Sequence, residues 1–264
     1  MSFSNTCGTF SKRGTLAALA LLGLVAFPQA AWAQVTLFDN GTLVTGIGDG
    51  FGGANTSTIF AGHDFFGVTV NNSIARLAED FTVSGGSWDL TELHWYAYQT
   101  GSTTTSTFTS AFVTIFDGVP GVPGTNVVAG DFSTNRLTSS AFSNIYRVFD
   151  SGSLTNTQRP VMDLTVDMSW VPDLVPGTYW LGVGATGSLG SGPFSPLRAV
   201  TYGASNLMQL DGGTGTWATV DVSSSAGTQA TEASFQLAGN IVGAPEPGTL
   251  ALGIAGGLAI KRRK

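Results

Sequence analysis

Alternation of apolar and polar residues with a period of two runs through the middle of the chain and is clearest over residues 163–170. Here Leu164, Val166, Met168 and Trp170 alternate with Asp163, Thr165, Asp167 and Ser169. Successive side chains of a strand point to opposite faces, so this pattern predicts a β-strand with one face in a core and the other in water. The pair Pro176-Gly177 predicts a turn into the next strand, Tyr179–Val183.

Other segments carry the same signals of strand structure. Phe108–Asp117 is apolar on both faces, which is typical of a buried strand, and the glycines and prolines of 117–124 predict a loop after it. The remaining predicted strands are Val35–Phe38, Phe81–Val83, Leu90–Gln99, Val127–Ala129, Ile145–Phe149, Leu207–Leu210, Trp217–Val220 and Ser234–Ala238. One short helical turn is predicted at Ser73–Glu79, with Asn71–Ser73 as its cap.

About ten strands and almost no helix predict an all-β fold. Residues 34–243 contain no linker that divides them, and about 210 residues is within the size of one all-β domain. Strands in this number protect their sheet edges best in two packed sheets. We therefore expect one antiparallel β-sandwich or jelly roll over 34–243, flanked by an N-terminal signal helix and a C-terminal hydrophobic helix.

The first 33 residues have the order of parts of a signal peptide. Lys12 and Arg13 precede the apolar run Leu16–Phe27, and Ala31-Trp32-Ala33 stands before Gln34. Small residues at the first and third of these positions, Ala31 and Ala33, are typical of a signal-peptidase site. Residues 1–33 are therefore predicted to be removed by signal peptidase during export, which makes Gln34 the first residue of the mature protein.

A second apolar run lies within residues 244–264. Pro245-Glu246-Pro247 precedes the run Gly248–Ile260, and four cations follow it: Lys261, Arg262, Arg263 and Lys264. As a helix of about 1.5 Å per residue the run reaches about 20 Å, short of the roughly 30 Å hydrocarbon core. It is therefore a marginal transmembrane helix, with its cations in the cytoplasm by the positive-inside rule. A buried helix of a soluble domain fits less well, because the run has no polar face.

This order of motif, short span and basic end resembles the PEP-CTERM sorting signal of Gram-negative bacteria. The resemblance implies that Pro245, Glu246 and Pro247 are read by an exosortase, a membrane-embedded processing enzyme. It also implies transient anchoring in the inner membrane, followed by delivery to the cell surface or extracellular matrix. Proteins with this signal are associated with bacteria that form exopolysaccharide, biofilm or floc.

The body of the chain is similar to the β-sandwich domains found before such tails. The likeness spans Ala78–Val183 and rests on Ala78–Val83, Trp88–Leu93, Tyr96–Gly101, Phe116–Gly118 with Pro123-Gly124, and Pro176–Leu181. These are turn and core residues, so the resemblance implies an architecture and says little about chemistry.

Removal of both ends changes the charge of the protein. The remaining body has no lysine and no cysteine, and its five arginines stand against sixteen acidic residues, a formal charge of −11. Nucleic acid is excluded as a partner because its binding requires a positive surface. Divalent cations and neutral or hydroxyl-rich polymers fit this charge better, and disulfides are excluded as a source of stability.

A candidate carbohydrate-binding surface lies in the predicted strand Leu90–Gln99. Alternation sends Glu92, His94, Tyr96 and Tyr98 to one face and Leu93, Trp95 and Ala97 to the other. If the second face is core, the first presents two tyrosine rings and an imidazole that can stack on a sugar and bond to its hydroxyls. The alternative is a central strand whose tyrosines, Tyr96 and Tyr98, pack beneath a loop.

Two acidic residues near the N-terminus are candidate calcium ligands. Asp39 and Asp49 lie in a glycine-rich stretch whose carboxylate and carbonyl oxygens suit a hard cation. The spacing is not that of an EF-hand, and glycine-rich loops between strands also form without metal. No metal or other cofactor is therefore assigned. The same glycines do not form a nucleotide-binding turn, since no helix follows them.

Catalysis is not indicated by any recognisable motif. The two histidines, His63 and His94, stand in neither a zinc-binding helix motif nor a serine-nucleophile motif. Glu92, Asp163 and Asp167 are candidates for a glycoside-hydrolase pair only if two of them face each other across a cleft. The sequence thus favours a non-catalytic surface or matrix protein that associates with exopolysaccharide, with a secreted polysaccharide hydrolase as the alternative.

Overall fold

Antiparallel pairing joins nearly all the strands of the protein, and the fold is all-β as the period-two pattern predicts. The computed structural model describes residues 35–58, 65–149, 152–200, 206–224 and 227–243. Within these ranges the only helical element is the short 3-10 turn η1 (Phe51–Gly53). The predicted terminal helices lie outside the described residues. Of the described part, no helix has the length and apolar character needed to cross a membrane.

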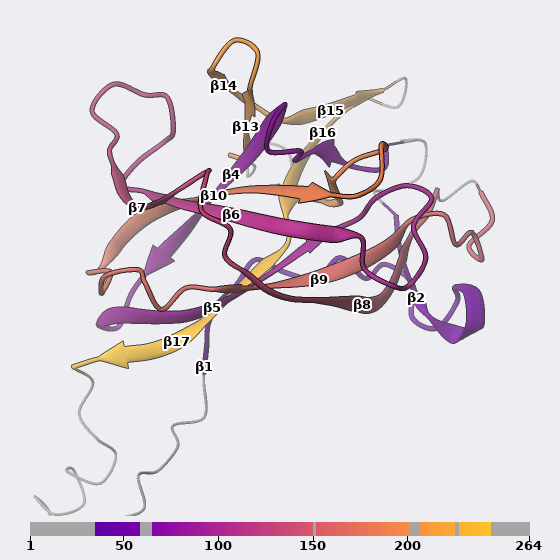
Figure 1. Cartoon of the computed structure of the whole chain (residues 1–264), viewed down its shortest axis with the longest axis horizontal. Coiled ribbons are helices and arrows are strands. Elements are labelled where there is room, and N and C mark those ends of the chain that lie inside the picture. The colour runs from indigo at the N-terminus through magenta and orange to yellow at the C-terminus, as the bar shows by residue number, and fades with distance from the viewer. Residues whose placement is uncertain (1–34, 59–64, 150–151, 201–205, 225–226, 244–264) are drawn as a thin grey trace, which may run out of the picture. The chain divides into compact units, whose positions relative to one another are not determined.

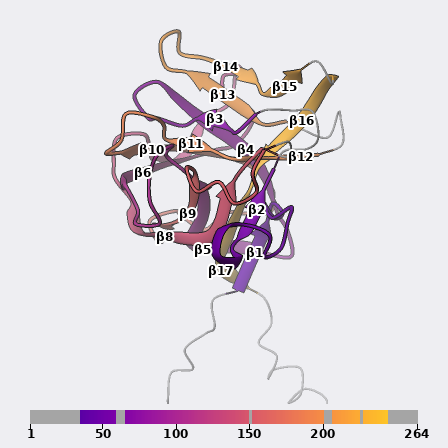
Figure 2. The ribbon, with the colours of Figure 1, turned by 90° about the vertical axis from the view of Figure 1, so that its right-hand side faces the viewer.

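The first sheet has six strands and forms the lower layer of Figure 1. Its order is β1 (Val35–Asp39), β17 (Phe235–Val242), β5 (Ser87–Ala97), β9 (Pro160–Asp167), β8 (Leu137–Arg147) and β2 (Asn55–Ser57). All neighbours are antiparallel except β2 and β8, which are parallel. The first and the last strand are therefore neighbours, and both ends of the described chain leave from one place (Figures 1 and 2).

The second sheet also has six strands, most of which lie above the first sheet in Figure 1. Its order is β14 (Thr216–Thr219), β13 (Met208–Asp211), β4 (Ala75–Val83), β10 (Gly177–Gly187), β6 (Phe108–Phe116) and β7 (Val127–Asp131). All of its pairings are antiparallel. The strand predicted at Phe108–Asp117 is confirmed as β6, which lies between β10 and β7.

Two smaller sheets complete the described fold. One joins β12 (Leu197–Ala199), β16 (Gly227–Ala233) and β15 (Asp221–Ser224), and the other joins β3 (Val68–Thr69) to β11 (Phe194–Ser195). Only Ser234 separates β16 from β17. The chain therefore passes directly from the three-stranded sheet into the first sheet.

Core side chains of the two six-stranded sheets belong to one hydrophobic cluster. Leu93 and Trp95 of the first sheet and Val113 and Ile115 of the second are each at most 1% exposed within it. Burial of one large apolar side chain contributes roughly 1.5–3 kcal/mol to stability. Since the body has no cysteine, this shared core is what holds the two sheets together.

Two local expectations are wrong. The helical turn predicted at Ser73–Glu79 is instead the start of β4, which begins at Ala75. Asn71 caps a tight turn before this strand. Its side-chain Oδ1 accepts a hydrogen bond from the Ser73 amide at 3.2 Å, and its backbone carbonyl accepts one from the Ala75 amide at 2.8 Å. The Asn71–Ser73 signal was thus a turn signal, because asparagine side chains bond their own backbone in turns as well as at helix caps.

The strand predicted over residues 163–170 ends early. β9 stops at Asp167, whose carboxylate accepts from the amide and hydroxyl of Ser169 and so turns the chain. Met168 still reaches the core, but Trp170 is only half-buried. The guanidinium of Arg136 lies 3.6 Å from the centre of the Trp170 ring, which makes this residue a stacking partner at the core boundary.

Glu79 is a carboxyl group buried between the sheets. It lies on β4 between Leu77 and Phe81 on the core side, is 3% exposed, and accepts a hydrogen bond from the Ala233 amide at 3.1 Å. Burial raises the pKa of Glu79 well above its ordinary value, and Glu232 and Asp80 add to this, while the Ala233 bond opposes it. Glu79 therefore favours its neutral form in the folded protein.

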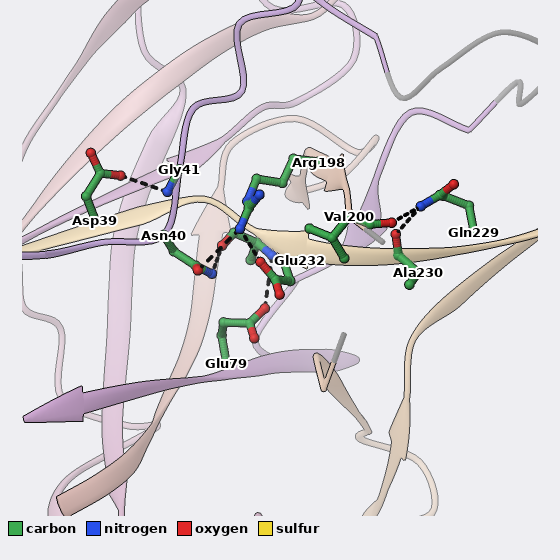
Figure 3. A network of polar contacts seen from close by, with 10 residues as sticks. Asp39, Asn40, Gly41, Glu79, Arg198, Val200, Gln229, Ala230 and Glu232 are labelled. Atoms are coloured by element: carbon green, nitrogen blue, oxygen red, sulfur yellow. Dashed lines mark hydrogen bonds and ion pairs between the residues drawn. The ribbon is translucent and has the colours of Figure 1, made fainter. Parts of the chain in front are cut away.

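A polar network surrounds Glu79 and joins three separate parts of the chain (Figure 3). Arg198 of β12 bonds to Glu232 of β16 and, at 3.5 Å, to the side-chain oxygen of Asn40. Asn40, just after β1, donates from its side-chain amide to the Ala233 carbonyl at 2.8 Å. The network thus fixes the point at which β16 passes into β17.

Replacing Glu79 by glutamine is expected to stabilise the protein at neutral pH. The unfolded chain releases the Glu79 proton once the pH exceeds the ordinary pKa of 4.5, whereas the folded chain retains it to higher pH because its pKa is raised. The stability of the folded protein therefore falls as the pH rises through this range. Glu79→Gln should therefore increase the free energy of unfolding at pH 8, measured by urea denaturation.

The same measurement at pH 5 should show a smaller gain for Glu79→Gln. The matched control is Asp173→Asn, which neutralises an exposed carboxylate and should leave the pH profile of the wild type unchanged. An equal effect of Glu79→Gln at both pH values would contradict the raised pKa of Glu79 in the folded protein.

Candidate functional site

The outer face of the first sheet carries the candidate binding residues of β5. Leu93, Trp95 and Ala97 are at most 1% exposed and point into the core, as alternation predicts. Glu92, His94 and Tyr96 lie on the opposite face and are half-buried. The prediction that these three share one outward face is confirmed.

Tyr98 is buried, so its prediction as an exposed platform residue is wrong, and the alternative of a tyrosine packed beneath another segment describes it. It is 1% exposed, and its ring lies 5.5 Å from that of Phe194. β5 ends at Ala97, and beyond that point the backbone of Tyr98 pairs with Phe194 in both directions at 2.9 Å. Burial raises the pKa of Tyr98, with Arg147 and Arg159 acting in the opposite sense. Alternation predicts the face of a strand residue but not its exposure, and here the segment that contains Phe194 covers the side chain.

His94 lies between two carboxylates. Its Nδ1 is 3.1 Å from both carboxylate oxygens of Asp163 on β9, and its Nε2 is 3.5 Å from Oε2 of Glu92. The side chains of all three residues are about one-third exposed. Water therefore reaches this group, and ion pairs in such a setting contribute little to stability. The three side chains form one polar group at the surface, in which the imidazole is hydrogen-bonded to Asp163.

Tyr96 forms the border between this polar group and a small apolar cluster. Its ring packs against Leu43, Ile145 and Val161, which are nearly or fully buried on the same side of the sheet. Burial raises the pKa of the Tyr96 hydroxyl, and the charges of Asp163 and Asp39 add to this effect. The hydroxyl is therefore neutral and is available both as a donor and as an acceptor.

Asp39 extends the group to the edge of the sheet. Its Oδ2 accepts from Nε2 of Gln236 on β17 at 3.0 Å, and its Oδ1 accepts from the Gly41 amide at 2.8 Å. Gln236 is the register partner of His94. A continuous band of polar side chains thus crosses four strands, and we call it the polar strip. It consists of Asp39, Glu92, His94, Tyr96, Asp163 and Gln236.

The two candidate calcium ligands have separate partners. Asp39 belongs to the polar strip, whereas Oδ1 of Asp49 accepts from the Thr56 hydroxyl at 2.8 Å. Gly46 lies against the Asp49 carboxylate so closely that a Cβ at this position would overlap it. Across the described ranges, no three or more His, Cys, Asp or Glu side chains gather in a way that suits a metal ion.

The acidic residues considered for glycoside hydrolysis are neighbours on one sheet. Glu92 and Asp163 flank the same imidazole on adjacent strands. Asp167 is the register partner of Glu92, but its carboxylate accepts from Ser169, which lowers the pKa of Asp167. These three carboxylates thus lie on neighbouring strands of one sheet. His63 lies outside the described residues.

All five arginines of the body are engaged within the fold, which the sequence did not indicate. Arg147 is fully buried and donates to the Phe66 carbonyl at 2.7 Å and to Oγ of Ser57 at 2.8 Å. Its burial lowers its pKa to about 10. The guanidinium groups of Arg76, Arg136 and Arg159 lie over the rings of Phe132, Trp170 and Phe66, and Arg198 pairs with Glu232. Arg147 is buried and the other four arginines are half-buried.

Several predicted residues lie outside the described part of the chain. These are the signal-peptidase residues Ala31, Ala33 and Gln34, the sorting motif Pro245, Glu246 and Pro247, and the basic end Lys261, Arg262, Arg263 and Lys264. Comparison with protein-family models, with curated protein sequences and with solved structures finds no match to this chain.

The two tyrosines are expected to differ in their effect on stability. Tyr98→Ala removes a fully buried aromatic ring and should lower the free energy of unfolding by about 3–5 kcal/mol. Tyr96→Ala removes a half-buried ring and should cost roughly 1–2 kcal/mol. Urea denaturation followed by tryptophan fluorescence measures both values. Equal losses in the two variants would contradict the different placement of the two side chains.

Proposed function

We propose that this is an exported, exosortase-processed protein of the cell surface or extracellular matrix of a Gram-negative bacterium, with a non-catalytic β-sandwich body. The observation that carries this proposal is the order of parts in the last twenty residues: Pro245-Glu246-Pro247, the apolar run Gly248–Ile260 and four terminal cations. Signal peptidase acts on the N-terminal segment and exosortase on the tail. Between these steps the protein is anchored transiently in the inner membrane.

The end of the fold supports processing at this motif. β17 ends at Val242, three residues before Pro245. Its hydrogen-bonded partners are all upstream in the chain, in β1 and β5. Cleavage near Pro245–Pro247 therefore removes no strand from the first sheet, and the body remains folded after its release from the tail.

The polar strip supports an association with exopolysaccharide. Its carboxylates, amide, imidazole and tyrosine hydroxyl are the groups that bond to sugar hydroxyls, and part of the Tyr96 ring lies beside them. Arg147 is buried, and the other four arginines are half-buried against aromatic rings or paired with a carboxylate, so the body offers a strongly anionic polymer no fully exposed arginine in the described ranges. The favoured ligand is a neutral, hydroxyl-rich polysaccharide. A polysaccharide hydrolase is the alternative.

Replacing Glu246 by alanine tests the sorting proposal. The variant is expected to remain unprocessed in its native host, because the central residue of the motif is lost. Mass spectrometry should find a longer chain, and fractionation should find most of it in the inner membrane. The control is Glu92→Ala, which removes a carboxylate from the body and should leave processing unchanged. Wild-type mass and distribution in the Glu246→Ala variant would overturn the proposal.

Binding of the body, residues 34–242, to the exopolysaccharide of its host tests the role of the polar strip. The double variant His94→Ala/Tyr96→Ala should bind about tenfold more weakly, since it loses a stacking surface and two hydrogen-bonding groups. Trp217→Ala is the control, because Trp217 is a half-buried aromatic residue of the other sheet. The assay is run with and without calcium. Absence of wild-type binding in both conditions would leave a purely structural surface protein.

A further inference from the structure

One end of the body combines both chain exits with exposed apolar side chains. Val35 at the start of β1 is 57% exposed, and Ile241 and Val242 at the end of β17 are each 42% exposed. Val175, in the turn before β10, is 60% exposed. We call these four residues the apolar rim. Of the ten large hydrophobic side chains that are exposed in the described part, four therefore belong to this end.

The strand register places the rim residues near one another. Val35 pairs with Gly239, two residues before Ile241. Ile241 pairs with Trp88 of β5, and Trp88 in turn forms a bridge with Leu174, the residue before Val175. Figures 1 and 2 both show β1 and the end of β17 together at the bottom of the view. The rim is thus a local feature of the fold and not a scatter of surface residues.

The chain beyond the rim is short. Residues 243–247 separate Val242 from the apolar run that begins at Gly248. The six steps from Val242 to Gly248 extend to at most about 22 Å, at roughly 3.6 Å per residue. If the run lies in the membrane, this end of the body is held within about 22 Å of the lipid surface, where even a weak contact is favoured by its high effective concentration.

The chemistry of the rim selects the kind of contact. Its four members are aliphatic, and the arginines of the body, which would bind lipid phosphates, are engaged elsewhere in the fold. Aliphatic side chains enter the boundary between headgroups and acyl chains, and uncharged lipid suits a body with a net negative charge. The fitting partner is therefore the surface of a zwitterionic bilayer.

We propose that the apolar rim is the membrane-facing end of the tethered protein and rests on the lipid surface until the tail is cut. This inference depends on the proposed membrane anchoring by the tail. The inference adds an orientation of the tethered body. The part that holds the start of β1 and the last residues of β17 faces the bilayer, and the opposite part of the sheets faces away from it. Processing removes the tether, and the rim contact alone is then too weak to retain the body.

A single fluorescent label on the predicted mature chain, residues 34–264, tests this orientation. This chain contains no cysteine, so an environment-sensitive dye is attached to Val175→Cys, in the rim, or to Ile47→Cys as the matched control. Ile47 is 88% exposed and lies near β2, toward the other end of β9. The eight residues of β9 span about 25 Å, so the control stands well away from the rim.

The labelled proteins are incorporated into phosphatidylcholine vesicles with and without brominated acyl chains. Quenching at position 175 is expected to exceed that at position 47 by about twofold or more, since bromine acts only on dyes near the acyl chains. Adding Ile241→Ser/Val242→Ser should reduce quenching at 175, and these exposed positions leave the core intact. Removing residues 244–264 should abolish it.

Flotation of the vesicles separates the two proposals. If the chain of residues 34–264 does not float with the vesicles, anchoring by the tail is overturned, and the rim proposal is overturned with it. A chain that floats but shows equal quenching at positions 175 and 47 overturns the rim proposal alone. Stronger quenching at 175 that survives Ile241→Ser/Val242→Ser overturns the role of the rim side chains.

Discussion

Burial of one face of each six-stranded sheet in a shared core is the interaction on which the rest of the structure depends. The body has no cysteine, so disulfides do not join the two sheets, and in the described ranges four of its arginines contact aromatic rings or a carboxylate while the fifth, Arg147, bonds mainly to backbone carbonyls. What joins the two sheets is the contact between strands such as β5 and β6, whose inward residues are almost wholly buried. Many outward positions of the first sheet are thereby left to polar side chains, and the polar strip occupies several of them.

Charge is handled differently inside and outside this core. Arg147 and Glu79 are both buried, yet they lie in separate places and are satisfied mainly by backbone groups. The remaining cations lie over aromatic rings or pair locally, while many carboxylates stay on the surface. The outcome is a surface with acidic groups and no exposed arginine in the described ranges. Such a surface repels polyanions and suits hydroxyl-rich or uncharged partners.

The position of the chain ends links the fold to the proposed route. β1 and β17 are the first and last strands and are also neighbours, so the segments leading to the predicted signal peptide and sorting tail leave from one end. Under the proposed tethering, a body built in this way presents its lateral sheet face, with the polar strip, to the surroundings. The common position of the two chain ends follows from strand pairing, whereas the tether and the orientation are proposals.

The sequence by itself determined the all-β class, most strand positions and the outward placement of Glu92, His94 and Tyr96, because period-two alternation is a local property that survives wherever a strand is flanked by core and solvent. It also carried the sorting hypothesis, which rests on a linear motif. Only the tertiary structure decided that Tyr98 is buried, that β9 stops at Asp167, and that Asp39 and Gln236 complete the polar strip. These depend on which distant segment covers or pairs with a residue, as Phe194 does for Tyr98, and no local pattern encodes that choice.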